Sequence, residues 1–371
     1  MRRGLMQWDP AEVPQALLQS RARSVADECR RRGLDALLAF ADFTRPCAVS
    51  ALTHYVPFWS QSFLVLMPSG ETTLVAATTG RTVQWIRQTS QVDNVVRTGD
   101  IGTATAEHLL EKLGAGRKRL GVVDLASMPA AAIGKLCRVH GQLELVAADD
   151  WFDQVPALQA PPVLAERALA IAGQGLAAAA AYAGVDGHAL VAAVDGACRV
   201  AGAEEAFVHV ALDLRRDPRL LCLEGPSPLG ERFAVQISLA YKGHWLRVAR
   251  TFERRPAAAG AVAAQTAEFL AQVGRGQSPS AVRAAVLGMP VAQQSVQPQG
   301  QQAAQAGALA EFWRVEGARG ALPLAFLDGS DAAQPQDRCQ PGATLALRLA
   351  TPDGWWHAAQ PYPLAGSAPN N

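Results

Sequence analysis

The stretch from Gly230 to Phe252, GERFAVQISLAYKGHWLRVARTF, constrains the fold more than any other part of the chain. Two runs rich in β-branched, aromatic and aliphatic residues, Arg232–Tyr241 and His244–Phe252, are separated only by Lys242-Gly243. Such runs favour strands, and a two-residue connection that contains glycine is typical of a tight turn. The stretch therefore predicts a long antiparallel hairpin around which a sheet is built.

The length and the apolar content of the chain predict two domains. A chain of 371 residues exceeds the usual size of one domain, and 49% apolar residues are enough for sizeable cores. Proline punctuates the stretch from Val155-Pro156 to Pro161-Pro162, and a helix start follows it. We therefore place one domain at residues 1–157 and the second at residues 158–371.

Charge and cysteine content argue against several partners. The net charge of +1 predicts no attraction to nucleic acid or to acidic membrane surfaces. No apolar run approaches the ~18–20 residues of a membrane span, and the first residues lack the apolar core of a signal peptide. The six cysteines show no CxxC spacing. We expect reduced thiols and a cytoplasmic location.

The first domain alternates expected helices and strands. Apolar residues at helical spacing predict a helix over Pro14–Arg32 that ends at Gly33. Further helices are expected at Ala104–Leu113 and Pro129–Val139. Strands are expected at Ala36–Ala41, Phe63–Met67, Thr72–Ala77, Leu120–Asp124 and Leu143–Ala147. This alternation indicates an α/β domain with a mixed sheet.

The second domain begins with two amphipathic helices. They are expected at Leu164–Ala183 and His188–Ala201, and a strand at Phe207–Leu212 follows. Beyond the hairpin, helices are expected at Ala257–Val273 and Pro279–Leu287. The Gln- and Ala-rich stretch Gln293–Gln305 is typical of an exposed loop.

The hairpin resembles that of the creatinase/aminopeptidase P family, also called the M24 or pita-bread family. The residues that carry the resemblance are Gly230, Ile237, Tyr241, Gly243 and the ending Arg250-Thr251-Phe252. The helical pair before the hairpin is similar as well, and the likeness becomes approximate after residue 290. It implies a creatinase-like α/β N-terminal domain and an α+β pita-bread C-terminal domain with a curved antiparallel sheet.

The resemblance also implies a site for two divalent cations held by carboxylates and histidine, yet the matching positions lack those residues. Gln236 and Arg247 stand where the family has its two aspartates. The other positions correspond to Ala318 or Arg319, to Arg348, and to a residue near Gln360. Hard cations need anionic oxygen or neutral imidazole ligands, and arginine repels them. We therefore expect no metal and no other cofactor.

Family members that work without metal use a histidine before the hairpin and acids in the emptied site. Asp213–Gly230 has no histidine at that position, His209 lies too early, and Ala249 supplies no acid. His244 and His357 remain as candidate general bases at neutral pH. A histidine on a strand is more often a packed core residue, so the catalytic role is the less favoured of the two interpretations.

The replaced residues suggest an anion site. Arg247, Arg250 and Arg348 are expected to converge with Gln236 from neighbouring strands, and buried guanidinium groups need an anionic partner. Internal acids such as Glu224, Asp213 or Glu231 are slightly favoured over a ligand carboxylate or phosphate. Arg250 also matches an arginine that the family keeps in a structural role.

The segment Thr44–Phe63 corresponds to the first long loop of the family, which lies near the active site of a dimer partner. It contains His54, Tyr55, Phe58 and Trp59, which the resemblance makes candidate pocket residues. The alternative is that these aromatic side chains pack the loop onto the sheet, and this is about twice as common.

Two classes of function follow. The first is a degenerate, metal-free pseudopeptidase that binds a small anionic, amino-acid-like ligand or an active paralogue. The second is a metal-independent hydrolase or C–N bond enzyme acting on a small carboxylate-bearing substrate in the re-used cleft. We expect a homodimer, or a heterodimer with the paralogue, and neither nucleic acid nor a membrane as a partner. The candidate ligand-binding residues are Gln236, Arg247, Arg250, Arg348, Gln360, His54 and Trp59.

Overall fold

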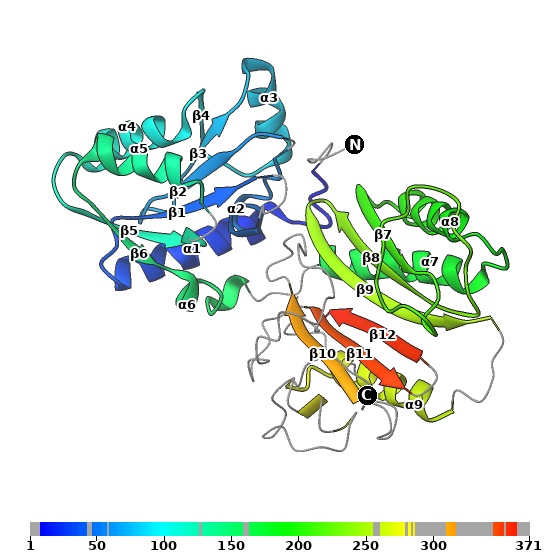
Figure 1. Ribbon diagram of the computed structural model, residues 1–371. Helices are drawn as coiled ribbons and strands as arrows, with labels where there is room; N and C mark the ends of the chain where they lie inside the picture. Colours follow the sequence, from blue (N-terminus) through cyan, green and yellow to red (C-terminus); the bar gives the residue numbers. More distant parts are fainter. Residues whose placement is uncertain are drawn as a thin grey trace. The chain divides into compact units, whose positions relative to one another are not determined.

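The computed structural model describes residues 8–42, 47–57, 59–125, 128–158, 163–254, 260–278, 281–282, 285, 309–316, 344–351 and 354–361. The chain divides into two compact units, Met1–Val163 and Leu164–Asn371. Figure 1 shows each unit as a sheet with helices packed against it.

The first unit is an α/β domain with a mixed sheet, as expected. Its helices are α1 (Gln15–Arg31), α2 (Cys47–Thr53), α3 (Gly80–Thr89), α4 (Ile101–Leu113), α5 (Ala130–His140), α6 (Asp149–Phe152) and the 3-10 turn Pro156–Leu158. Its strands are β1 (Ala36–Ala41), β2 (Ser62–Leu66), β3 (Thr72–Ala77), β4 (Asn94–Thr98), β5 (Lys118–Val123) and β6 (Leu143–Ala147), in the order β4-β3-β2-β1-β5-β6. The β1–β2 and β2–β3 pairs are antiparallel and the others parallel.

Helices cover both faces of this sheet, which explains why β1 is apolar at every position. Leu37 and Ala39 face a core shared with α1 and α2. Leu38 and Phe40 face a second core shared with α4 and α5. Successive strand residues point to opposite faces, so a strand buried on both sides reads as a continuous apolar run.

The second unit contains α7 (Val163–Ala181), α8 (Gly187–Val200), β7 (Glu205–Ala211), β8 (Arg232–Tyr241), β9 (His244–Glu253), α9 (Gly260–Gly274), β10 (Leu309–Glu316), β11 (Thr344–Thr351) and β12 (Gly354–Pro361). Its strands follow the order β10-β11-β12-β9-β8-β7, and all neighbours are antiparallel. The expected α+β architecture is confirmed.

The predicted hairpin is also confirmed. Strands β8 and β9 pair over their whole length, from Arg232 opposite Glu253 to Tyr241 opposite His244. Lys242 and Gly243 both have positive φ, 45° and 77°. Positive φ at both central residues is the signature of the turn that matches the twist of paired strands. The Gly243 amide donates a 3.0 Å hydrogen bond to a carboxylate oxygen of Glu204, which holds the turn against the start of β7.

Described helices cover one face of the second sheet. Val235, Ile237 and Leu239 of β8 pack in a core with α7 and α8. Leu345 and Leu347 of β11 pack with α9 in a separate cluster. Figure 1 shows α7 and α8 beside β7–β9. By alternation, Gln236, Ser238 and the residues aligned with them point to the opposite face, which we call the inner face.

The stretch Pro156–Ala181, whose described helical parts are the 3-10 turn and α7, is long and apolar enough to cross a membrane by length and composition only, which is also true of core helices in soluble proteins. Ala168, Ile171 and Ala172 of α7 lie in the second-domain core. Val163 and Leu169 are exposed on the same helix.

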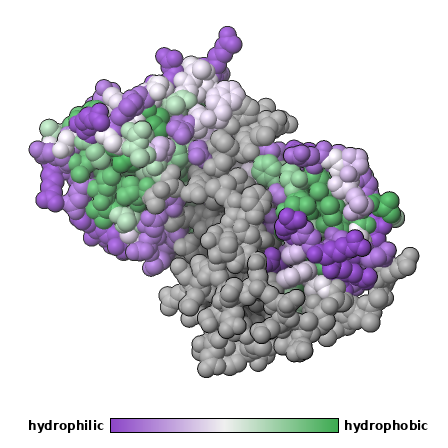
Figure 2. All heavy atoms as spheres, in the orientation of Figure 1, coloured by the Kyte–Doolittle hydropathy of each residue, from purple (hydrophilic) through white to green (hydrophobic). Residues whose placement is uncertain are grey.

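Figure 2 shows apolar residues gathered on the visible face of each unit, with hydrophilic residues around them.

Candidate functional site on the inner face

A single row of side chains crosses five strands of the inner face. The register aligns His209 of β7 with Gln236 of β8, and Gln236 with Ala249 of β9. Ala249 pairs with Ala359 of β12, which pairs with Ala346 of β11. Residues directly opposite each other on adjacent strands share a face. The centre of the inner face is therefore made of methyl groups, with two polar side chains at one end.

The alanines are buried and covered by a loop. Ala249, Ala346 and Ala359 form one apolar cluster, and Leu220 packs against it. Leu220 comes from the connection between β7 and β8. Leu214 anchors that connection by donating to the Arg232 carbonyl and accepting from the Trp355 amide, both at 2.8 Å. The loop thus delivers an apolar side chain to the centre of the face.

We call the cluster of Ala249, Ala346 and Ala359 the alanine floor. Gln236 is buried beside this floor without a hydrogen bond. Its exposed fraction is 0%, and neither its Oε1 nor its Nε2 atom has a hydrogen-bond partner in the described structure. Its neighbour His209 is partly buried. Burial, with a smaller contribution from the charge of Arg247, lowers the pKa of His209. Both effects favour the neutral form of the His209 imidazole.

Arg247 is a buried cation one row away from Gln236. It is 2% exposed, and its Nε donates a 2.9 Å hydrogen bond to Ser238 Oγ on the paired strand. Gln236 and Arg247 are diagonal neighbours across β8 and β9, since Ser238 is the residue opposite Arg247. The structure brings these two predicted site residues together.

Arg250 and Gln360 are also brought together, but they bind each other. The Arg250 guanidinium donates to Gln360 Oε1 at 2.6 Å and to the Ala359 carbonyl at 2.7 Å. Burial lowers the pKa of Arg250 to about 10, which still leaves it charged at neutral pH. These bonds tie β9 to β12 where the two strands meet. The geometry gives Arg250 a structural role.

His357 and Arg348 form the next pair across β12 and β11. His357 is 0% exposed, and neither ring nitrogen has a hydrogen bond of good geometry to any described residue. Burial first, and then the charge of Arg348, lower the pKa of His357 to about 3. The Arg348 guanidinium lies over the ring of Trp355, 5.3 Å from its centroid. Cation–π contact stabilises it there.

The structure does not bring Arg247 and Arg348 to one point, contrary to the sequence-based expectation. Arg247 precedes Ala249 by two residues, whereas Arg348 follows Ala346 by two residues on a strand two positions away. Strand spacing and rise place their Cα atoms roughly 16 Å apart. The two guanidinium groups also contact different residues, Ser238 and Trp355. A residue pattern could not reveal this, because the offset depends on the β9–β12 register.

The remaining candidate histidine lies at the far end of the hairpin. His244 pairs with Tyr241 beside the turn and keeps part of its ring accessible. The surrounding protein still removes enough water to lower its pKa to about 4. It lies outside the central row.

The candidate pocket residues of the segment Thr44–Phe63 lie in the first unit, whereas the inner face lies in the second. The segment Thr44–Phe63 contains helix α2 in its described part, where we expected a loop. His54 follows α2, is 2% exposed, has φ 61° and lies 6.2 Å from the ring of Trp8. Trp59 is 69% exposed. Tyr55 is buried and packs edge-on against Trp85, which supports the packing interpretation for that residue.

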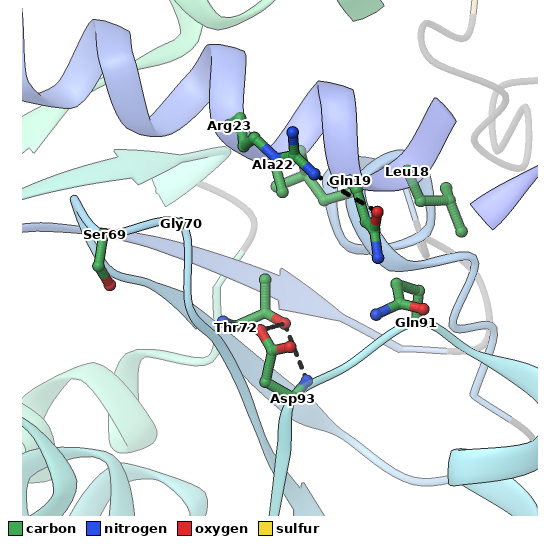
Figure 3. Close-up of a pocket in the computed structure, with 10 residues that line it drawn as sticks. Leu18, Gln19, Ala22, Arg23, Ser69, Gly70, Thr72, Gln91 and Asp93 are labelled. Carbon is green, nitrogen blue, oxygen red and sulfur yellow. Dashed lines mark hydrogen bonds between the residues drawn. The ribbon is translucent and has the colours of Figure 1, made fainter. Parts of the chain in front are cut away.

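A separate pocket of about 240 Å³ lies in the first unit between α1 and the β2–β3 turn. Figure 3 shows Asp93 bonded to Thr72, and Arg23 bonded to Gln19 one turn away on the same helix, α1. The Asp93 carboxylate accepts from both the amide and the hydroxyl of Thr72. These polar groups satisfy one another, and the pocket shares no residue with the inner face.

The residues that the structure describes on the inner face do not fit a dinuclear metal centre. Among the described residues, no group of three or more His, Cys, Asp and Glu side chains could hold a cation. The central row offers one amide, one imidazole and three methyl groups, and a divalent cation prefers carboxylates. Ala318, Arg319, the stretch Gln293–Gln305 and Phe58, which the sequence analysis singled out, lie outside the described residues.

Sequence reasoning missed the alanine floor and Leu220. Alanine carries no chemical signal in a sequence, and Leu220 lies in a loop whose path the residue pattern does not reveal. The β8–β9 register alone would have placed Ala249 beside Gln236.

No protein-family model matches the chain, and no curated protein matches it. Solved structures do. The prolidase from Pyrococcus horikoshii OT3 aligns over 92% of this chain and 94% of its own, with a TM-score of 0.65 and 12% identity. The X-Pro aminopeptidase from Thermotoga maritima MSB8 covers 90% and 94%, with a TM-score of 0.61 and 12% identity. Dipeptidase PepE from Mycobacterium ulcerans covers 94% and 93%, with a TM-score of 0.59 and 18% identity. The chain therefore has the two-domain fold of the prolidases and X-Pro aminopeptidases, the M24 fold that its hairpin predicts.

Proposed function

We propose that this chain is a metal-free, degenerate homologue of the M24 peptidases that acts in the cytoplasm by binding instead of hydrolysis. The observation that carries the proposal is the central row of the inner face. Three buried alanines, covered by Leu220, occupy its middle, and an uncharged glutamine lies beside them. The resemblance places a metal ligand at the position of Gln236. The replacement therefore falls at a position that would take part in metal-dependent hydrolysis.

Hydrolysis of an amide requires a group that activates water and a group that stabilises the developing charge. No described residue of the alanine cluster supplies either. His357 is a poor base, because a pKa of about 3 makes its imidazole a weak proton acceptor. His209 is the one imidazole in the central row, and it lies at the row's end beside an amide. A metal-independent hydrolase is therefore the less favoured function.

The proposed ligand is a small, amino-acid-like molecule, and the alternative partner is an active paralogue with the same fold. Arg247 and Arg348 do not clamp one anion jointly, because their side chains contact Ser238 and Trp355 respectively. Each arginine remains a local positive charge at the border of the alanine floor.

Elemental analysis and a peptidase assay test this function together. We expect substoichiometric Mn, Zn, Co and Fe in protein purified without chelator, and no cleavage of Xaa-Pro dipeptides with or without added Mn²⁺. A metal-dependent prolidase assayed in parallel is the positive control. Two metals per chain, the content of a dinuclear site, or cleavage restored by Mn²⁺ would overturn the proposal.

A further inference from the structure

Gln236 is an unusual residue to keep in a protein interior. Buried amides nearly always have hydrogen-bond partners, because leaving the donor and acceptor unmet costs the full desolvation of the group. Gln236 is completely buried, and both of its amide atoms lack a partner among the described residues. A leucine of similar size would avoid the cost. A polar group retained at such a cost often marks a functional site.

A second side chain of the same kind lies on the other side of the alanine floor. His357 is fully buried and uncharged at neutral pH. Neither ring nitrogen makes a hydrogen bond of good geometry, and the one polar group that acts on the ring by hydrogen bonding is the Pro218 backbone of the covering loop, whose effect on the pKa is smaller than that of burial. It lies two residues from Ala359 on β12, on the same face. A neutral imidazole offers one donor and one acceptor, as does an amide.

The sheet fixes the separation of these two groups. Gln236 and His357 are two strands apart and two residues apart along the strands, which places their Cα atoms roughly 12 Å apart. Both side chains point to the inner face, so a small molecule that reached both would lie over the alanines, where Leu220 now packs. The methyl groups of Ala249 and Ala359 form an apolar surface between them.

The loop above the floor supplies an apolar cover. Leu220 contacts the alanine cluster. Hydrogen bonds fix the loop at Leu214 and again at Leu221, whose amide and carbonyl both pair with Val210. Between these anchors, Arg215, Arg216 and Arg219 are exposed. Leu220 lies between these anchors, and its side chain contacts the alanines by apolar packing.

We propose that the inner face between Gln236 and His357 binds a small neutral molecule with a carboxamide group and an apolar body, and that Leu220 closes over it. This inference rests on the proposed non-catalytic function and names its ligand class. A carboxamide meets the Gln236 amide with one donor and one acceptor, which satisfies both of its unmet atoms. A carboxylate would accept from Nε2 but has no donor for Oε1, so that acceptor would remain unmet. The alanine methyl groups and Leu220 suit an apolar body.

Benzamide and benzoate are matched probes for this test, because they share a ring and differ only in the amide or carboxylate. Isothermal titration calorimetry on the full chain is expected to show benzamide binding at least tenfold more tightly than benzoate. Gln236→Leu and His357→Leu are each expected to weaken benzamide binding at least tenfold. Gln174→Leu, on an exposed position of α7 outside the site, is expected to leave it unchanged.

Three results would overturn the inference. One is the absence of benzamide binding to a well-folded wild-type protein. Another is tighter binding of benzoate than of benzamide, which would show that the site prefers an anion to a neutral carboxamide. The third is benzamide binding that survives Gln236→Leu, with folding of that variant checked by circular dichroism. None of these results depends on metal content or peptidase activity, so the inference can fail while the proposed function holds, and the reverse also applies.

Discussion

His357 and Arg348 face each other across β11 and β12. The Arg348 guanidinium lies over the ring of Trp355, while burial keeps the imidazole beside it neutral. The same two residue types would read as a catalytic pair in the sequence. In the folded chain, burial sets their chemistry, because removing water disfavours the charged form of histidine far more than any neighbour favours it.

The neutral state of His357 predicts a stability that falls in acid. Its pKa is about 3 in the folded chain and near 6.5 in an unfolded one, so the unfolded state binds one more proton between these values. The free energy of unfolding should therefore fall as the pH drops from about 6.5 towards 3. We expect urea unfolding at pH 7.5 and pH 5 to show a larger loss for the wild type than for His357→Leu, by roughly 1–2 kcal/mol, since one pKa unit corresponds to about 1.4 kcal/mol.

His188→Leu, at an exposed position of α8, is the control and should keep the wild-type pH dependence. Glu204 acts in the opposite direction, because burial raises its pKa to about 7 and its contribution weakens stability as the pH rises from 4.5. The wild type and His357→Leu both contain Glu204, so its effect cancels when their pH dependences are compared. If the free energy of unfolding falls equally in the wild type and in His357→Leu between pH 7.5 and pH 5, His357 is not the neutral buried group that we describe.

At the scale of elements, the β7–β8 loop depends on one glycine at the start of β12. Gly354 has φ 127°, and a Cβ atom there would lie 2.4 Å from the Leu214 carbonyl oxygen and 2.8 Å from the Arg215 Cα. The neighbouring Trp355 amide donates to that same Leu214 oxygen. Glycine at this position therefore lets the loop approach the sheet closely enough to deliver Leu220.

Gly354→Ala is expected to destabilise the protein by roughly 2–5 kcal/mol, through backbone strain at positive φ and a clash with backbone atoms that cannot move aside. Chemical denaturation measures the change. Gly173→Ala on the exposed side of α7 is the matched control, because a Cβ atom there meets nothing within 4 Å. It should stabilise the helix by about 0.5–1 kcal/mol. A Gly354→Ala protein as stable as the wild type would show that the loop does not need this approach.

Sequence reasoning predicted most elements but not how they meet. The runs Ala36–Ala41 and Thr72–Ala77 are strands with the predicted bounds, because apolar continuity is a strong signal. It missed α3 and β4, since β4 is half exposed and its residues Asn94–Thr98 do not form a uniform apolar run. The sequence alone identifies Gln236 and Arg247 as replacements of family metal ligands. It does not predict the residues around them, because Ala346, Ala359 and Leu220 reach the site through long-range pairing.

At the scale of the whole molecule, each unit has its own core and its own sheet. The inner face lies entirely in the second unit, whereas the aromatic segment that follows α2 lies in the first. Tyr55 is buried in that segment while Trp59 remains 69% exposed. An exposed tryptophan is a large apolar area left in water, and tryptophan is enriched at the centres of protein interfaces.

We therefore predict a dimer in which Trp59 is buried. Light scattering coupled to size exclusion at micromolar concentration should give twice the chain mass of 39.2 kDa. Trp59→Ser should shift the protein towards the monomer, because it removes a large apolar contact without disturbing the buried core. Val185→Ser changes an equally exposed apolar residue, 70% accessible, in the second unit and should remain dimeric. A monomeric wild type would contradict the dimer, and a Trp59→Ser protein that stays dimeric would place the interface elsewhere.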